Sequence, residues 1–268
     1  MSASEESVTS PRTPPSPLGV VVVLGFGNQG EAHARNLRDA GEQVRVAARP
    51  GRAAEARALA LGFAVATPAK SLAGADTLAV LLPDEAVPQA WPELAAHARD
   101  VRTVVFAHGF NLLYGALAFP ERASVVLVSP TGPGRVLREL YETGAGLPAY
   151  LAVHQAGAQD AWAVATHYAT ALGCARAQLL RTTVREETEV DLFGEQAVLC
   201  GGLHGLLTAA FETLVEKGYA PEMAYLECIH QLQYLAELLH ERGLAGARRS
   251  ISATALFGDF TRGPRVVS

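Results

Sequence analysis

The sequence predicts an α/β protein, in which a Rossmann-type, doubly wound parallel sheet is followed by an all-helical C-terminal domain. Short apolar, β-branched runs alternate with helical segments up to about residue 184, and the first run ends in a glycine-rich loop. After residue 185 the apolar residues recur every three or four positions, with few turn signals. We therefore expect a disordered leader at 1–18, a nucleotide-binding domain at 19–184 and a helical domain at 185–268.

The composition narrows the class of protein. A net charge of −5 over 268 residues offers no basic surface for nucleic acid or an anionic membrane. The three cysteines form no C-x-x-C pair, which favours a reducing, cytoplasmic setting. We expect no apolar run of the length that a membrane span needs. The leader, rich in serine and proline, has neither the apolar core of a secretion signal nor the arginine-rich character of a transit peptide.

The strands follow from the apolar runs. Residues 19–24 (GVVVVL) are typical of a strand buried on both faces of a parallel sheet. Helices such as 31–40 and 53–61 separate the runs. The further predicted strands are 43–48, 77–82, 102–107, 124–129, 148–153 and a short last one at 177–184.

The helical half divides at two turn signals, Gly218 and Pro221. A long helix is expected from about residue 186, and a second one from Pro221 to Arg242. Pro221 suits a first helical turn, and Gly243 suits a C-terminal stop.

The glycine-rich loop predicts a dinucleotide site. It connects the first strand to a helix that we expect to begin near Glu31. Its glycines serve the tight turn, the close approach of backbone to a pyrophosphate, and helix–strand packing, while the helix N-terminus meets the negative charge. The alternative is a glycine-rich turn without a ligand. The loop comprises Gly25, Phe26, Gly27, Asn28, Gln29 and Gly30.

The end of the second strand favours NADPH over NADH. An NAD-preferring fold usually ends this strand with an acidic residue for the ribose 2′-hydroxyl. Here the segment carries Arg49 and Arg52 instead, and guanidinium groups match a 2′-phosphate in charge and geometry. The alternative is that both arginines are solvated loop residues.

Acidic residues in the helical half predict a Mg²⁺ site. Asp191 and Glu195 are spaced i, i+4, as are Glu227 and Gln231, so each pair presents two oxygen-bearing side chains on one helix face. A solvated helix face is the alternative. His108 follows the strand 102–107, where ligands gather in open α/β sheets. The acidic cluster at 186–189 either lines an electronegative site for cations or places favourable charge at a helix N-terminus, and we interpret it as the latter.

With these residues the chain resembles ketol-acid reductoisomerase, an enzyme of branched-chain amino-acid biosynthesis that migrates an alkyl group and then reduces with NADPH. The resemblance extends from about Gly19 to Arg265. It is carried by the glycine loop and by several ordered blocks, at 83–85, 106–111, 132–134, 186–196, 199–202, 221–227, 250–252 and 258–259.

The resemblance implies roles for individual residues. Asp191 would bridge two Mg²⁺ ions, Glu195 would complete the first site, and Glu227, supplied across a dimer in that family, would bind the second ion. His108 lies at the junction of cofactor and active site. The remaining implied contacts are cofactor contacts at Arg49, Arg52, Asp84 and Gly134, and substrate contacts at Gln231 and Ser252.

Four departures limit what the resemblance implies. Gln231 replaces a glutamate, Thr131 a lysine and Arg135 a histidine of the family pattern, and the sequence ends at Ser268, so the family's knotted domain is not carried over. A neutral amide weakens a second cation site. We therefore expect Mg²⁺-assisted, NADPH-dependent reduction of a 2-oxo acid or related imine in a homodimer or higher homo-oligomer, with alkyl migration weakened or lost.

Other functions stay open at this point. One is an authentic ketol-acid reductoisomerase, and another is a non-catalytic NADPH-binding homologue. A β-hydroxyacid dehydrogenase or imine reductase of similar build is disfavoured, because many of the former use a lysine on the inter-domain helix. This chain has no lysine between Lys70 and Lys217.

Overall fold

The computed structural model describes residues 16–267, in two compact units that divide between Asp191 and Leu192. Residues 1–15 of the predicted leader lie outside the described residues. Its last residues are packed against the first unit. Leu18 is fully buried, and the Ser16 hydroxyl donates a hydrogen bond to Glu42 Oε2 over 2.6 Å.

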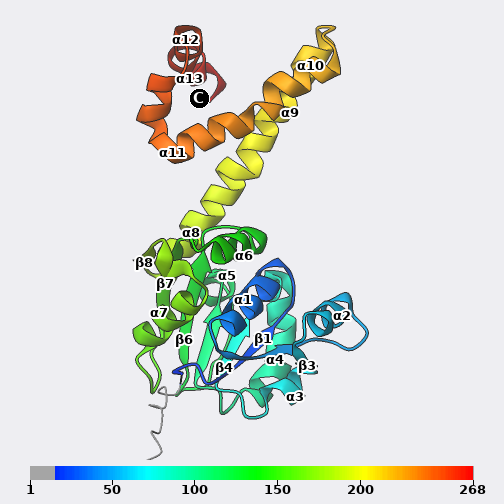
Figure 1. The fold of residues 1–268 in the computed structure, drawn as a ribbon, viewed down its shortest axis with the longest axis vertical. Helices are drawn as coiled ribbons and strands as arrows, with labels where there is room; N and C mark the ends of the chain where they lie inside the picture. Colours follow the sequence, from blue (N-terminus) through cyan, green and yellow to red (C-terminus); the bar gives the residue numbers. More distant parts are fainter. Residues whose placement is uncertain (1–15, 268) are drawn as a thin grey trace, which may run out of the picture. The chain divides into compact units, whose positions relative to one another are not determined.

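The first unit is built on an eight-stranded sheet with the order β3-β2-β1-β4-β5-β6-β7-β8 (Figure 1). The first six strands in this order, from β3 at the edge to β6, pair in parallel. The strand order reverses between β1 and β4, which confirms the predicted doubly wound arrangement. The short edge strand β3 was not predicted. The strands are β1 (Val20–Leu24), β2 (Gln43–Ala47), β3 (Ala64–Ala66), β4 (Thr77–Val80), β5 (Thr103–Phe106), β6 (Ser124–Pro130), β7 (Ala149–Gln155) and β8 (Leu179–Arg181).

Two strands, β7 and β8, run opposite to the other six, which corrects the prediction of a wholly parallel sheet. β7 pairs antiparallel with β6, and Ala149 lies opposite Pro130. The reason lies in the segment between β6 and β7, which returns to the same edge of the sheet at which β6 ends. Its helix ends in the left-handed Gly144 (φ 81°), and the Thr131 amide donates to the Pro148 carbonyl over 2.9 Å. The chain therefore re-enters the sheet beside the carboxyl end of β6.

Two apolar layers sandwich the sheet. Alternate residues of β1 face opposite sides, so Val21 and Val23 join one core and Val22 and Leu24 the other. The first core is covered by α1 (Asn28–Asp39), α2 (Ala53–Ala60), α6 (Gly134–Thr143) and α7 (Ala161–Ala171). The second is covered by α3 (Pro68–Leu72), α4 (Val87–His97) and α5 (Phe110–Leu113).

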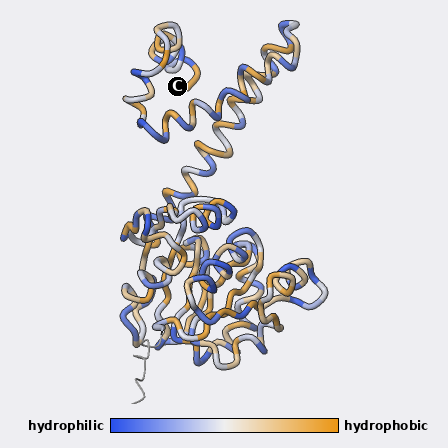
Figure 2. Tube along the Cα trace, in the orientation of Figure 1, coloured by the Kyte–Doolittle hydropathy of each residue, from blue (hydrophilic) through white to orange (hydrophobic). Residues whose placement is uncertain are grey.

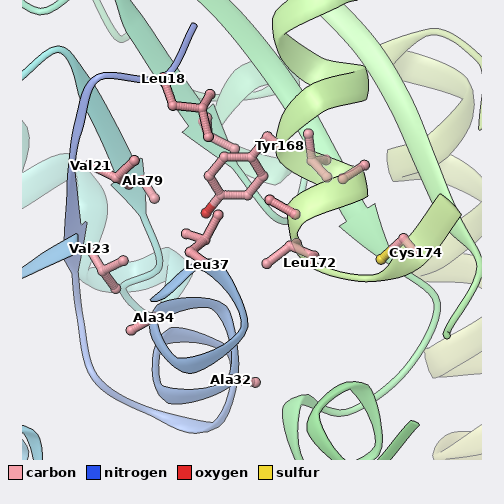
Figure 3. Packing of buried hydrophobic residues seen from close by; sticks show 14 of the residues in the cluster. Leu18, Val21, Val23, Ala32, Ala34, Leu37, Ala79, Tyr168, Leu172 and Cys174 are labelled. Carbon is pink, nitrogen blue, oxygen red and sulfur yellow. The ribbon is translucent and has the colours of Figure 1, made fainter. Parts of the chain in front are cut away.

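A buried aromatic residue lies at the centre of the first core. Figure 3 shows the Tyr168 ring among Leu18, Leu37 and Leu172, with all four side chains fully buried. The Tyr168 hydroxyl lies 3.0 Å from Nδ1 of the equally buried His33. This hydrogen bond links α7 to α1, the helix that follows the glycine loop.

The chain becomes wholly helical after β8. Pro221 occupies the first turn of its helix, as predicted, and the backbone leaves helical geometry at Gly243 (φ 62°, ψ 174°). Two π-helical turns were not predicted. The elements are α8 (Val184–Phe193), the π-turn η3 (Gly194–Leu199), α9 (Gly201–Glu216), α10 (Pro221–Tyr225), the π-turn η4 (Leu226–His230), α11 (Leu232–Ser250), α12 (Ala253–Thr261) and α13 (Gly263–Val266).

The second unit has almost no core of its own. Among its described residues the only buried apolar side chains are those of Ala224 and Ala247. Large apolar side chains such as Phe193, Leu199 and Phe257 are more than half exposed. Figure 2 shows hydrophobic residues recurring along α9 to α11 among hydrophilic ones. The helical segment Val184–Glu216 is long and apolar enough to cross a membrane by length and composition alone, which the sequence analysis did not anticipate.

Candidate active site

The glycine loop has the geometry that a dinucleotide requires. Gly25 has a φ of 93°, and a Cβ added to it would lie 2.5 Å from the Leu81 carbonyl oxygen. A Cβ on Gly30 would lie 1.9 Å from the Gly25 carbonyl oxygen, so this glycine allows the helix to pack against the strand. A Cβ on Gly27 would meet no atom within 4 Å. Gly27 therefore borders open space, as the close approach of a pyrophosphate to the loop requires.

Two helix N-termini meet at this loop. A Cβ on Gly134, in the first turn of α6, would lie 2.0 Å from the Asn28 carbonyl oxygen, and Gln29 Nε2 donates to the Gly132 carbonyl over 2.9 Å. Neither α1 nor α6 has a side-chain cap, so their first amides stay available for an anion. Gln29 Oε1 is buried without a hydrogen-bond partner among the described residues. The helix begins at Asn28 rather than near Glu31, which brings Asn28 and Gln29 into its first turn.

The arginines after β2 are exposed. Arg49 lies in the loop, and Arg52 is the N-cap residue of α2. Within residues 16–267 neither guanidinium forms an ion pair, so both are free to bind a phosphate. A third arginine was not singled out from the sequence. Arg57 of α2 donates a hydrogen bond to the Phe26 carbonyl and lies 4.0 Å from Glu31 Oε2, so it links α2 to the glycine loop.

His108 lies between two carboxylates at the carboxyl edge of the sheet. Its Nδ1 is 2.9 Å from Asp84 Oδ2, and its Nε2 is 3.1 Å from Asp191 Oδ2. The Asp191 and Asp84 carboxylates together raise the pKa of His108 to about 10, against a smaller effect of burial. Asp84, which we expected to contact the cofactor, uses its carboxylate to hold this ring.

Glu187 is a site residue that the sequence analysis missed. Its side chain is 3% exposed, and its Oε1 has no hydrogen-bond partner among the described residues. Burial raises the pKa of Glu187. Within the 186–189 cluster, Glu186 and Glu189 are exposed and paired with Thr182 and Arg185. Glu187 lies in the first turn of α8, as the interpretation of the cluster as helix N-terminal charge expects, but unlike Glu186 and Glu189 it is buried.

A close contact joins α8 to the loop that carries His108. A Cβ on Gly109 would lie 2.0 Å from Thr188 Oγ1 and 2.8 Å from Glu187 Oε2. Val184, Glu187 and Thr188 are buried, at the spacing of one helix face. This spacing is the signal that could have identified Glu187 from the sequence.

The other predicted ligands belong to the second unit. Glu195 lies in the π-turn η3 and Glu227 in η4, and π-turns are frequent at functional sites. Gln231 Nε2 donates to Glu227 Oε2 over 2.8 Å, so this pair shares a helix face as expected. The Ser252 hydroxyl caps α12 by accepting from the Ala255 amide. Within residues 16–267 no three His, Cys, Asp or Glu side chains gather in an arrangement that could hold a metal ion.

The departures at Thr131 and Arg135 have local partners. The Thr131 hydroxyl donates to the Pro148 carbonyl over 3.0 Å. Arg135 pairs with Glu139 over 2.6 Å on the exposed side of α6. Thr131 therefore supplies no positive charge at the position of the family lysine.

Comparisons with known proteins agree with this architecture. Residues 19–178 match the family model described as acetohydroxy acid isomeroreductase, NADPH-binding domain, and residues 184–268 match ketol-acid reductoisomerase, C-terminal domain. The structure of an NADH-preferring ketol-acid reductoisomerase from an uncultured archean is 35% identical, with a TM-score of 0.89 over 93% of this chain and 77% of that chain.

More distant structures share the fold alone. A semialdehyde dehydrogenase NAD-binding protein from Cupriavidus necator is 17% identical, with a TM-score of 0.72 over 93% of this chain and 92% of that one. A pyrroline carboxylate reductase from Plasmodium falciparum is 10% identical, with a TM-score of 0.55 over 94% and 92%.

Proposed function

We propose, since this chain belongs to the ketol-acid reductoisomerase family of NAD(P)-dependent oxidoreductases, that it reduces a 2-oxo acid or related imine with NADPH and Mg²⁺, and that alkyl migration is weakened or lost. One observation carries the proposal. His108 is held between Asp84 and Asp191 at the edge of the sheet where the glycine loop lies. The protonated His108 ring therefore lies next to a carboxylate at the edge of the sheet where we expect the nicotinamide to bind.

The open space at Gly27, the uncapped N-termini of α1 and α6, and the unpartnered Gln29 Oε1 fit a dinucleotide. The exposed Arg49 and Arg52 support NADPH, because each can pair with a 2′-phosphate without first breaking an ion pair.

The residues around His108 suit reduction of a carbonyl. A bound NADPH would supply the hydride, and Asp191, Glu195 and Glu227 would hold a Mg²⁺ ion that would polarise the reacting carbonyl. His108 carries a proton on Nε2 near neutral pH, because its pKa is raised, so it provides a donor for the oxygen that gains charge. Glu187 offers a buried acceptor oxygen, which could accept a hydrogen bond from a water molecule bound to such a cation.

Two observations support weakened migration. Gln231 donates its amide nitrogen to Glu227, so Glu227 shares an oxygen with a neutral neighbour. The Thr131 hydroxyl donates its hydrogen bond to the Pro148 carbonyl, and the residue adds no positive charge where the family has a lysine. Alkyl migration develops charge on the oxygens of the ketol, and it therefore depends on a second cation and nearby positive charge more than hydride transfer does.

The test compares two substrates in one assay. With NADPH and Mg²⁺, a 3-hydroxy-2-oxo acid requires reduction only, whereas 2-acetolactate requires migration first. We expect turnover of the former and about tenfold or more slower turnover of the latter, equivalent to about 1.4 kcal/mol in barrier. The double variant Gln231→Glu/Thr131→Lys should narrow this gap. Equal rates with both substrates in the unaltered protein would contradict the proposal.

An authentic ketol-acid reductoisomerase is the second candidate. The match of both domain models and the 35% identity to such an enzyme favour it. Conversion of 2-acetolactate to the 2,3-dihydroxy acid at the rate of the reduction-only substrate would establish this reading. Calorimetry with Mg²⁺ in the presence of NADPH tests the metal separately.

The second unit supports a homodimer or higher homo-oligomer. The described residues of this unit bury only two apolar side chains, those of Ala224 and Ala247, which is too little for a core of its own. Large exposed apolar side chains usually mark an interface. A second copy of the chain would also let Glu227 of the partner subunit reach Asp191. Sedimentation should give a dimer or larger species at micromolar concentration, and a monomer that still binds Mg²⁺ tightly would refute a shared site.

A further inference from the structure

Asn111 is a buried residue whose side-chain amide contacts Asp84, the partner of His108. We propose that Asn111 is a positioning residue for the reduction, which fixes Asp84 and through it the ring of His108. This inference rests on the proposed function for its catalytic consequence, but its structural content can be tested without turnover. The comparisons and the sequence motifs assign no role to Asn111.

The hydrogen bonds of Asn111 are directed at one residue. Its Nδ2 donates to the main-chain carbonyl of Asp84 over 3.1 Å and to Oδ1 of the same residue over 3.0 Å. Both acceptors are oxygens that can only accept, so the amide orientation is fixed, because a flipped amide would oppose oxygen to oxygen. The Asn111 side chain is 2% exposed. It therefore cannot contact substrate directly, and any effect on chemistry passes through Asp84.

Asp84 divides its two oxygens between two partners. Oδ1 accepts from Asn111, and Oδ2 lies 2.9 Å from His108 Nδ1. The Asp84 side chain is 39% exposed, so without the amide it is free to rotate towards solvent. A histidine ring whose Nδ1 donates to a fixed carboxylate directs its Nε2 along one line. Asp191 Oδ2 lies 3.1 Å from this Nε2 as an ion-pair partner, off the direct line of a hydrogen bond.

The arrangement links two loops at the carboxyl edge of the sheet. Asp84 begins the short turn η1 (Asp84–Ala86) after β4, whereas His108 and Asn111 follow β5. Phe110 stacks on His108, with ring centroids 6.3 Å apart and an interplanar angle of 21°. The aromatic contact restrains the tilt of the His108 ring. The Asn111–Asp84 pair restrains the rotation of the ring about its Cβ–Cγ bond, because Asp84 holds Nδ1.

The experiment follows the His108 Nδ1 proton in full-length protein labelled with ¹⁵N-histidine at one fixed pH. A His108→Gln sample assigns the signal among the eight histidines. The test variants are Asn111→Ala, which removes the amide, and Asn111→Asp, which keeps the shape but replaces the donor by an acceptor. Asn36→Ala is the matched control. Asn36 is another fully buried asparagine, and it donates to the Leu172 carbonyl, away from this edge of the sheet.

We expect a hydrogen-bonded Nδ1 proton in the unaltered protein and in Asn36→Ala, and a signal shifted upfield or lost to exchange in both Asn111 variants. Steady-state assays should show kcat reduced about 10- to 100-fold by the Asn111 changes, with the KM for NADPH within about twofold of the original. An unchanged Nδ1 signal in both Asn111 variants overturns the proposal, whatever the activity. A shifted signal with unaltered kcat also overturns it. If the unaltered protein reduces no substrate, the proposed function fails, while the signal still decides whether Asn111 positions His108.

Discussion

Two glycines of the same loop should respond in opposite ways to an added methyl group. Gly27 has φ −85° and ψ −159°, which alanine adopts without strain, and its Cβ would meet no protein atom within 4 Å. Alanine reduces the entropy of the unfolded chain but is a poorer N-cap, so the net change in unfolding free energy should stay within about 1 kcal/mol. The methyl group would occupy the space next to the loop amides. NADPH binding should therefore weaken at least about tenfold, equivalent to about 1.4 kcal/mol.

Gly30 is the matched contrast. An added Cβ would lie 1.9 Å from the Gly25 carbonyl oxygen, roughly half a van der Waals contact, and both atoms belong to the main chain. Relieving this overlap means moving α1 away from β1, at a cost of about 1–3 kcal/mol or more. Urea unfolding followed by tryptophan fluorescence, together with NADPH titration, separates the two effects. A Gly27→Ala protein that binds NADPH normally, or a Gly30→Ala protein of normal stability, would refute the reasoning.

Further predictions concern selectivity, acid stability and the docking of α8. The Arg49→Ala/Arg52→Ala protein should bind NADPH about 10- to 100-fold more weakly and NADH within about twofold of normal, because only the 2′-phosphate contact is lost; equal losses for both cofactors would contradict this. Burial lowers the pKa of His33 to about 3, so its neutral form stabilises the fold above pH 6.5, and this contribution is lost as the pH falls towards 3. The part of the unfolding free energy that His33 contributes should thus fall by about 2 kcal/mol from pH 7.5 to pH 5. The raised pKa of His108 acts in the opposite direction, so the effect is measured as the difference between the urea profiles of the unaltered protein and His33→Gln. Gly109→Ala should destabilise the first unit by about 1–3 kcal/mol, and thermal unfolding of the double variant with Thr188→Ala should show partial recovery, because the clashing Oγ1 is gone.

Much of the first unit is predictable because its signals are local. The apolar run at 19–24 coincides with β1 to within a residue, and the glycine loop follows it as expected. The three-residue strand β3 is too short to show a pattern of its own. The antiparallel direction of β7 depends on the end of β6 at which the connecting segment re-enters the sheet. The positions of apolar runs in the sequence carry no information about that end. Strand direction is set by chain path, so it required the structure.

The site was predictable only in part. His108 follows a predicted strand, and the resemblance added Asp191, but the contact of His108 with both Asp84 and Asp191 is a tertiary fact. The role of Asp84 in holding that ring had no sequence signal. Glu187 stands among charged neighbours, and its only sequence signal is the spacing that it shares with Val184 and Thr188 on the buried face of α8.

The second unit poses a different difficulty. The prediction that each acid pair shares a helix face assumed regular α-helix, whereas Glu195 and Glu227 each lie in a π-turn. A π-turn comes from one additional residue in a helix, and it has no composition that marks it out. Its position therefore could not be predicted from hydrophobic spacing.

The contact between the starts of α1 and α6 has a consequence for biosynthesis. The Gln29–Gly132 hydrogen bond joins positions 103 residues apart, so the cradle for the phosphates does not exist until both segments have left the ribosome. A nascent chain that has emerged only through β5 should therefore not be retained by an immobilised nucleotide. One that has emerged through α6 has both helix ends. Cofactor capture during translation would thus begin before the helical half has been made.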